Sequence, residues 1–183
     1  MSRRSALRHG LASLALWLAA CASPPQRPGE PAWTTGRLSL RVQATADQAE
    51  RSFSAAFELR GDSRQGELNI QSPLGTRLVS AQWAPTLARL LTPQGEQAYA
   101  SLDELSRQAL GESLPLAALP DWLAGRPWAQ ASHQPGAAGF DQLGWSVDLS
   151  RQREGWITAR REAPTAVLLR VKLDAAEASG AQP

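Results

Sequence analysis

The chain has 183 residues, of which 43% are hydrophobic and 20% are charged. Its formal net charge of +2 is misleading, because residues 1–20 hold three of the 19 Lys and Arg but no Asp or Glu. The remaining residues carry 16 basic and 17 acidic side chains, a net charge of −1. This balance excludes the basic surface of a nucleic-acid-binding protein, and the length fits one domain with a substantial core.

Residues 1–20 have the parts of a lipoprotein signal peptide. Three arginines precede an apolar run over 11–20, and that run is too short to span a membrane. Leu18-Ala19-Ala20-Cys21 matches the bacterial lipobox, in which the leader is cleaved and the cysteine carries N-acyl and S-diacylglycerol groups. The alternative is an ordinary cleaved leader with a stray cysteine. Acylation explains an unpaired thiol in an oxidising compartment, so we predict that Cys21 is lipidated.

The mature chain is expected to begin with a tether. Residues 22–32 contain four prolines, which predicts an extended segment over 21–32. Position 22 is alanine, whereas an aspartate there retains lipoproteins of enteric-type bacteria in the inner membrane. We therefore expect an anchor in the outer membrane of a Gram-negative bacterium, on its periplasmic side. The folded domain is predicted over 33–174, and a flexible tail over 175–183.

From Trp33 onward, apolar residues alternate with polar ones, which is typical of strands with one buried face. An antiparallel meander that is apolar on one side is the expected result. The predicted strands lie near residues 38–42, 53–59, 68–70, 79–83, 87–91, 96–100, 145–149, 156–160 and 167–173, and residues 130–141 are expected to form a loop.

Two helices are expected to interrupt the strands. Ser101-Leu102-Asp103-Glu104 is a capping box, in which Glu104 returns a hydrogen bond to the cap, and Gly111 closes this helix. A second helix is predicted between Pro115 and Ala124. Pro120 either restarts that helix as its first residue or kinks it. An antiparallel sheet with so few helices predicts an open, curved barrel around an apolar cavity, or a core that the helices seal.

Residues that would support catalysis or metal binding are mostly absent. His133 is the one histidine beyond the leader, and a zinc site needs several convergent ligands. The sequence contains neither a nucleophile elbow nor a glycine-rich phosphate loop. Asp103 and Glu104 fit a helix start, where carboxylates complement the macrodipole. We expect no catalytic site, no metal and no cofactor.

One turn instead carries an apolar residue. Ser72-Pro73-Leu74-Gly75 lies between two predicted strands, where proline and glycine supply turn geometry. Leu74 either folds back onto the barrel or projects into solvent to meet a membrane. Burying one leucine is worth about 1.5–3 kcal/mol, which biases a tethered protein toward insertion without anchoring it.

Together these pieces resemble the outer-membrane lipoprotein LolB family. The resemblance runs through most of the domain, in the segments Gly36-Arg37-Leu38, Gly66-Glu67-Leu68, Ser72-Pro73-Leu74-Gly75, Trp83-Ala84-Pro85, Tyr99 with 101–105, Leu110-Gly111, 114–116, 122–127 and Gln142-Leu143-Gly144-Trp145. It implies a mainly β fold: an incomplete antiparallel barrel of about eleven strands with a helical lid and an apolar cavity.

The resemblance also implies a function. LolB-like proteins accept acylated lipoproteins from the periplasmic carrier LolA and insert them into the outer membrane without ATP. It implies that Leu74, flanked by Pro73 and Gly75, makes the membrane-insertion loop. The implied partners are LolA, acylated cargo and outer-membrane lipid, and a monomer is expected.

The alternation of apolar and polar residues predicts which side chains could line the cavity, but it does not decide which of them face the cavity and which are buried under the helices. The proposed lining residues are Leu38, Leu40, Phe53, Phe57, Leu68, Ile70, Val79, Trp83, Trp122 and Trp145. Two other functions remain open, a lipoprotein that senses a lipid or hydrophobic ligand and a structural adaptor of the envelope.

Overall fold

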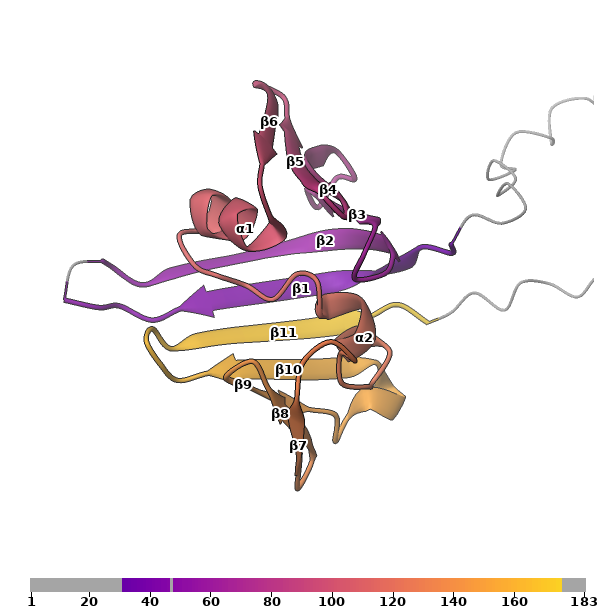
Figure 1. The fold of residues 1–183 in the computed structure, drawn as a ribbon, viewed down its shortest axis with the longest axis vertical. Helices are drawn as coiled ribbons and strands as arrows, with labels where there is room; N and C mark the ends of the chain where they lie inside the picture. Colours follow the sequence, from indigo (N-terminus) through magenta and orange to yellow (C-terminus); the bar gives the residue numbers. More distant parts are fainter. Residues whose placement is uncertain (1–30, 47, 176–183) are drawn as a thin grey trace, which may run out of the picture. The chain divides into compact units, whose positions relative to one another are not determined.

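The computed structural model describes residues 31–46 and 48–175 (Figure 1). Cys21, the signal peptide, most of the tether and most of the tail lie outside the described residues. The predictions made for those segments therefore stay predictions.

Within the described residues, eleven strands form one antiparallel sheet. The strands are β1 (Thr34–Val42), β2 (Arg51–Gly61), β3 (Gly66–Gln71), β4 (Arg77–Ala84), β5 (Leu87–Thr92), β6 (Gly95–Tyr99), β7 (His133–Gly136), β8 (Gly139–Gln142), β9 (Trp145–Asp148), β10 (Trp156–Arg161) and β11 (Val167–Leu173). Their spatial order is β6-β5-β4-β3-β2-β1-β11-β10-β9-β8-β7. Because β6 and β7 end this order without pairing to each other, the sheet stays open, and the predicted mainly β, incomplete-barrel fold is confirmed.

The strand register places the alternating apolar residues on one face, which we call the inner face. Leu38 lies opposite Ala55 and Val171, and Leu40 lies opposite Phe53 and Leu169. Directly opposite residues of antiparallel strands share a face. The same register continues to the outer strands, so the apolar surface runs across the sheet and forms the core.

Two helices cover the inner face. Helices α1 (Leu102–Leu110) and α2 (Leu119–Leu123) lie on the same side of the central strands (Figure 1). Helix α1 packs against β5 and β6, and α2 packs against β2. A short 3₁₀-helix, η1 (Gln152–Glu154), joins β9 to β10.

Helix α1 begins and ends as the sequence predicts. The Ser101 hydroxyl accepts a hydrogen bond from the Glu104 backbone N–H at 3.1 Å, and Gly111 takes the left-handed conformation at φ 70°. The returned bond differs in one detail. Glu104 Oε2 accepts from the Ala100 backbone N–H at 2.9 Å rather than from the cap residue itself.

Two other predictions need correction. The second helix has only five residues, and Pro120 lies in its first turn, where a missing N–H is tolerated. The helix therefore starts near this proline instead of kinking at it. Residues 130–141 are not a loop, because β7 and most of β8 lie there. These strands have four residues each, and the hairpin includes Pro135, Gly136 and Gly139, so the sequence shows no alternation long enough to predict them.

Candidate functional site

Most residues proposed to line a cavity are buried between the sheet and the helices. Seven of the ten are buried (Leu38, Leu40, Phe57, Leu68, Trp83, Trp122 and Trp145), Ile70 and Val79 are half-buried, and Phe53 is 38% exposed near the start of β2. The inner face is thus apolar, and in this structure α1, α2 and the segments beside them cover it. It opens toward solvent near Phe53.

Trp122 of α2 is the largest fully buried side chain, at 1% exposure, and it packs edge-on against Phe140 and at a tilt against Trp145. A buried amide fixes its position. Gln142 Oε1 accepts from Trp122 Nε1 and from the Trp128 backbone N–H, both at 2.9 Å. Gln142 Nε2 donates to the carbonyls of Trp128 and Ala131, both at 2.8 Å. Both donors and both acceptor positions of this amide are therefore in use.

A buried ion pair joins the helix connection to the sheet. Arg161 ends β10 on the inner face, and its guanidinium donates to Glu112 Oε2 at 2.5 Å and to the Ser113 carbonyl at 3.0 Å. It also lies over the Trp145 ring, 5.3 Å from the centroid. Because both partners are about nine-tenths buried, each charge depends on the other. The pair holds residues 112 and 113, which follow α1, against the strand.

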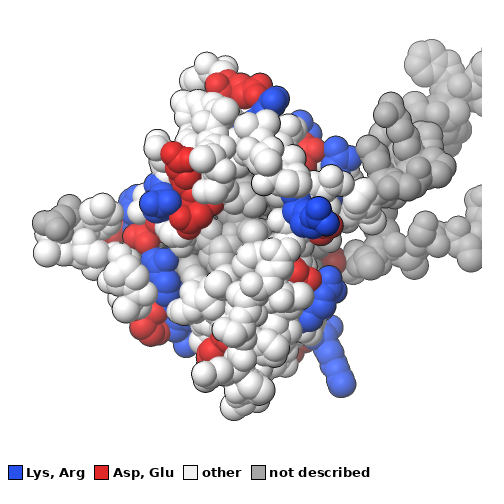
Figure 2. Space-filling model, viewed as in Figure 1, with Lys and Arg blue, Asp and Glu red and all other residues white. Residues whose placement is uncertain are grey.

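A pocket opens where these elements meet, and we call it the mouth pocket. Its volume is about 340 Å³. It is lined by the start of α1 (102–103), the connection 113–118, Trp128, Leu143 on the β8–β9 turn, Trp145 and Arg161. Figure 2 views this side of the molecule, and the surface over α2 and β7–β9 is mostly uncharged.

The charges that line the mouth pocket are paired. Arg161 pairs with Glu112, as described above, and Asp103 accepts from Arg107 at 2.8 Å and from the Ser113 hydroxyl. Asp103 therefore serves an exposed ion pair and a helix start. Together with the apolar lining, this arrangement suits an uncharged, apolar ligand.

Leu74 lies at the tip of the β3–β4 hairpin and is 94% exposed. Its turn is closed by a hydrogen bond of 2.9 Å from the Gly75 N–H to the Ser72 carbonyl. The Ser72 hydroxyl accepts from the backbone N–H groups of Leu74 and Thr76, at 3.3 and 3.2 Å. Gly75, at φ 79°, turns the chain back into β4. The backbone of this tip is thus held from within, and the leucine side chain projects away from the core.

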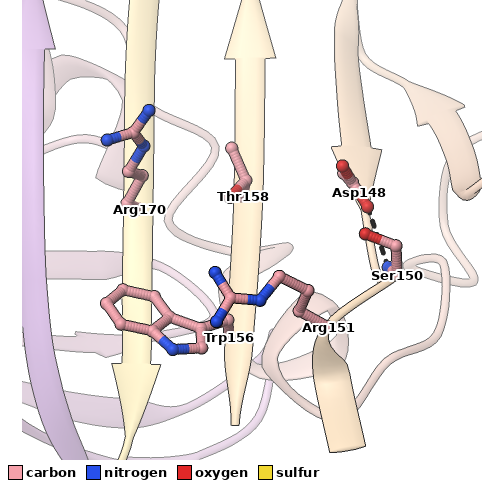
Figure 3. Close-up of a pocket in the computed structure, with 6 residues that line it drawn as sticks. All are labelled: Asp148, Ser150, Arg151, Trp156, Thr158 and Arg170. Carbon is pink, nitrogen blue, oxygen red and sulfur yellow. Dashed lines mark hydrogen bonds between the residues drawn. The ribbon is translucent and has the colours of Figure 1, made fainter. Parts of the chain in front are cut away.

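A second pocket lies on the outer face of the sheet and is polar (Figure 3). Arg170, Thr158 and Asp148 face it from β11, β10 and β9, and the dashed line in the figure joins Ser150 to Asp148. Hydrogen bonds from the Ser150 hydroxyl and backbone N–H hold the pKa of the Asp148 carboxyl below its ordinary value. Arg151 donates to Glu154 across the end of η1. Apart from the Trp156 ring, this lining consists of charged and polar side chains, in contrast to the mostly apolar lining of the mouth pocket.

The structure describes the surroundings of His133, the one histidine beyond the leader. His133 begins β7, and its ring meets Phe140 edge-on with centroids 6.4 Å apart. The described residues contain no group of three or more His, Cys, Asp or Glu placed to hold a metal ion. Within the same residues, no helix is both long and apolar enough to cross a membrane.

Comparison with known proteins gives the family. The model of the family "Outer membrane lipoprotein LolB" matches residues 32–177. The chain belongs to the LolB family. It is 30% identical over 167 residues to the outer-membrane lipoprotein LolB of Bordetella petrii, covering 84% of each chain. It is 34% identical over 144 residues to that of Cupriavidus metallidurans, covering 72% of this chain and 71% of the relative. The LolB of Dechloromonas aromatica is 33% identical over 126 residues, or 65% of each chain.

Membership of the LolB family confirms the resemblance read from the sequence. The coarse function follows: this is an outer-membrane lipoprotein that acts as a receptor in lipoprotein localisation. The roles of Cys21, of the Leu74 loop and of the inner-face residues are not tested by these matches and stay predictions.

Sequence reasoning missed three residues that shape the site, Gln142, Glu112 and Arg161. A signal for Arg161 exists, because it continues the inward set Ile157 and Ala159 at a spacing of two. A basic residue at an apolar position predicts a buried partner. Gln142 has a weaker signal, its place two residues after Phe140 in a short hairpin. Glu112 has none, since nothing in its own segment marks it as buried.

Proposed function

We propose that this LolB-family protein takes the acyl chains of lipoproteins from a LolA-like periplasmic carrier onto its inner face and inserts them into the outer membrane. The observation that carries the proposal is Leu74, a 94% exposed leucine held at the tip of a well-bonded turn. A protein that only senses a lipid needs the apolar face but not this tip. An envelope adaptor needs neither.

The inner face binds the acyl chains of the cargo and does not recognise the cargo's protein part. Each acyl methylene withdrawn from water is worth about 0.8 kcal/mol, so a lipoprotein needs an apolar shelter throughout its passage. Apolar packing uses few directed bonds, which suits many different cargo proteins. No nucleotide is required if each step is downhill, because about 1.4 kcal/mol per step gives a tenfold bias.

Loading requires the lid to shift, because α1 and α2 cover most of the inner face. Helix α2 is suited to this motion. It has five residues, too few for stability as an isolated helix, and its position depends on the burial of Trp122 and the bonds of Gln142. Acyl chains that replace these apolar contacts would let α2 move without exposing the inner face to water.

Release places Leu74 in the bilayer. Inserting this leucine is worth about 1.5–3 kcal/mol, too little to hold the protein but enough to bias its orientation. The lipid predicted at Cys21 keeps the protein at the membrane, so the tip needs only to bring the loaded inner face into contact with lipid. In this mechanism no side chain acts as an acid, base or nucleophile.

The proposal is tested by a two-stage transfer assay with the full acylated chain in liposomes. Lipoprotein bound to its carrier is added, and cargo bound to the receptor is measured separately from cargo inserted in the bilayer. We expect Leu74→Glu to load cargo normally and to insert it at least tenfold more slowly, because a carboxylate resists entry into lipid.

The matched control is Thr86→Glu, which places the same charge on the exposed β4–β5 turn at the other end of β4. It should insert cargo at the wild-type rate. Normal insertion by Leu74→Glu would remove the role of this loop. Failure of the wild-type chain to accept cargo from the carrier would overturn the proposed function as a whole.

A further inference from the structure

The β8–β9 turn holds a leucine in a conformation that leucine rarely adopts. Gln142 and Trp145 lie directly opposite each other, so Leu143 and Gly144 form a two-residue turn with φ of 56° and 77°. Such a turn favours Asn-Gly, because a leucine Cβ crowds the backbone at positive φ. Leu143 is also 46% exposed. Neither its backbone nor its exposure favours folding, and strained residues of this kind cluster at ligand sites.

Leu143 lines the mouth pocket, whose other walls suit an apolar ligand. Its volume of about 340 Å³ lies at the lower end of the range for small-molecule sites, about 300–1,000 Å³. The facing wall is the connection 113–118, in which every residue except Ser113 is apolar. Arg161 is the one cation in this lining and is paired with Glu112, so a phosphate or a carboxylate finds no free counter-charge among the lining residues that the structure describes.

Trp128, also in the lining, adds one polar requirement. Its indole N–H is buried and has no hydrogen-bond partner among the described residues. By contrast, Trp122 Nε1 donates to Gln142, and Trp83 Nε1 donates to the Asp62 carbonyl at 2.9 Å. Buried donors are nearly always satisfied. Gln142 holds the Trp128 backbone through both its N–H and its carbonyl, so the indole stays beside the pocket. Its N–H lies below the surface, and a small rotation of the ring brings it to a bound ligand.

An apolar ligand that also brings one uncharged acceptor satisfies all of these features. We infer that the mouth pocket binds the ester-bearing end of a cargo acyl chain. Leu143 packs against the methylenes next to the ester, and Trp128 Nε1 donates a hydrogen bond to the ester carbonyl oxygen. This inference rests on the proposed function and adds the place where cargo chains enter, between the β8–β9 turn and the connection of the two helices.

The first test uses two probes that differ only in the carbonyl, methyl laurate and methyl dodecyl ether. Their affinities are measured by calorimetry on the mature chain carrying Cys21→Ala, which has no lipid of its own. We expect Trp128→Phe to weaken the ester about two- to tenfold, the range for one hydrogen bond, and to leave the ether unchanged. Equal effects on both probes, or no effect, would overturn the assignment of the carbonyl to Trp128.

The second test replaces the turn leucine. Leu143→Asn keeps the favoured turn residue and should weaken both probes about tenfold, because it removes apolar surface from the pocket. The matched control is Leu78→Asn, since Leu78 is 48% exposed and lies outside the mouth pocket. It should bind both probes as the wild type does. If the two variants bind alike, the mouth pocket is not the site.

A third measurement needs no variant. A triacylated lipopeptide with a diazirine beside the ester is delivered from the carrier to the full acylated chain and photolysed. We expect adducts on 113–118 or Leu143, and adducts found only elsewhere would overturn the inference. Adducts from a diazirine-bearing phospholipid in the liposome, or from the chain's own lipid, would likewise contradict cargo as the occupant. Normal cargo transfer by Leu143→Asn and Trp128→Phe would refute this entry site alone, whereas a wild-type chain that takes no cargo would refute the proposed function.

Discussion

Two hairpin tips have the sequence Leu-Gly, and they differ in the backbone conformation and the exposure of the leucine. At the β3–β4 tip, Leu74 has an unstrained backbone, and the left-handed residue is Gly75. At the β8–β9 tip both residues are left-handed, including Leu143 itself. Leu74 is 94% exposed and projects from the core, whereas Leu143 is 46% exposed and borders the mouth pocket.

The difference shows that an exposed leucine can face two kinds of apolar partner. Leu74 is 94% exposed, so little of the protein contacts it, and on the proposed mechanism its partner is the bilayer. Leu143 already shares a pocket with Trp128 and Trp145, so a ligand that completes this pocket fits it. On the proposed mechanism the two tips serve opposite ends of one process, entry of the acyl chain at Leu143 and its release near Leu74.

The largest expected difference in stability between the two regions comes from Arg161→Ala, because Arg161 lines the mouth pocket beside Leu143 and not the Leu74 turn. It leaves Glu112 buried without a partner, which should reduce the free energy of unfolding by about 3–5 kcal/mol. Denaturant unfolding measures this loss, and amide hydrogen exchange should show faster opening of 112–118 but unchanged exchange at 72–76. Arg107→Ala breaks an exposed pair with Asp103 instead, and its loss should stay below about 1 kcal/mol. A comparable loss in both variants would contradict a specific role for the buried pair.

The two glycines should respond alike. Gly75 and Gly144 both have φ near 78°, and a Cβ at either would meet open space. Alanine at each should therefore lower stability by about 1 kcal/mol through backbone strain alone. Thermal or denaturant melts check this. A much larger loss at Gly144 would mean that the strain at Leu143 is coupled to its neighbour, and the two tips would then differ in rigidity as well as in direction.

The smallest effect concerns the leucines themselves. Leu143→Asn should raise the free energy of unfolding by up to about 1 kcal/mol, because asparagine tolerates the left-handed conformation. Leu74→Asn should change it by less than about 0.5 kcal/mol, because the side chain touches so little. Denaturant unfolding of the two variants measures both changes. A loss of stability in Leu143→Asn would show that Leu143 is held by packing, and its strain would no longer indicate a functional site.

Much of this fold was predictable because period-two alternation is a property of the chain itself. Leu38, Leu40 and the residues opposite them share a face whatever the loops do. The cap of α1 at Ser101 and its end at Gly111 are equally local. The hairpin β7–β8 was missed because its strands are too short for a period to appear. Gln142 and Arg161 were missed because their partners, Trp122 and Glu112, lie 20 and 49 residues away, and no local pattern reports such a distance.

An open sheet has two edge strands, and both have features that disfavour pairing with another chain. The border strand β7 has four residues and places Pro135, which has no N–H to offer, within them. The other border, β6, presents Glu96, whose carboxylate pairs with Arg89 beside it. A neighbouring copy therefore finds little exposed backbone to pair with, even where the lipid anchors predicted for these proteins would bring copies close together on one membrane surface. The sheet can therefore stay open for the proposed passage of acyl chains without promoting polymerisation.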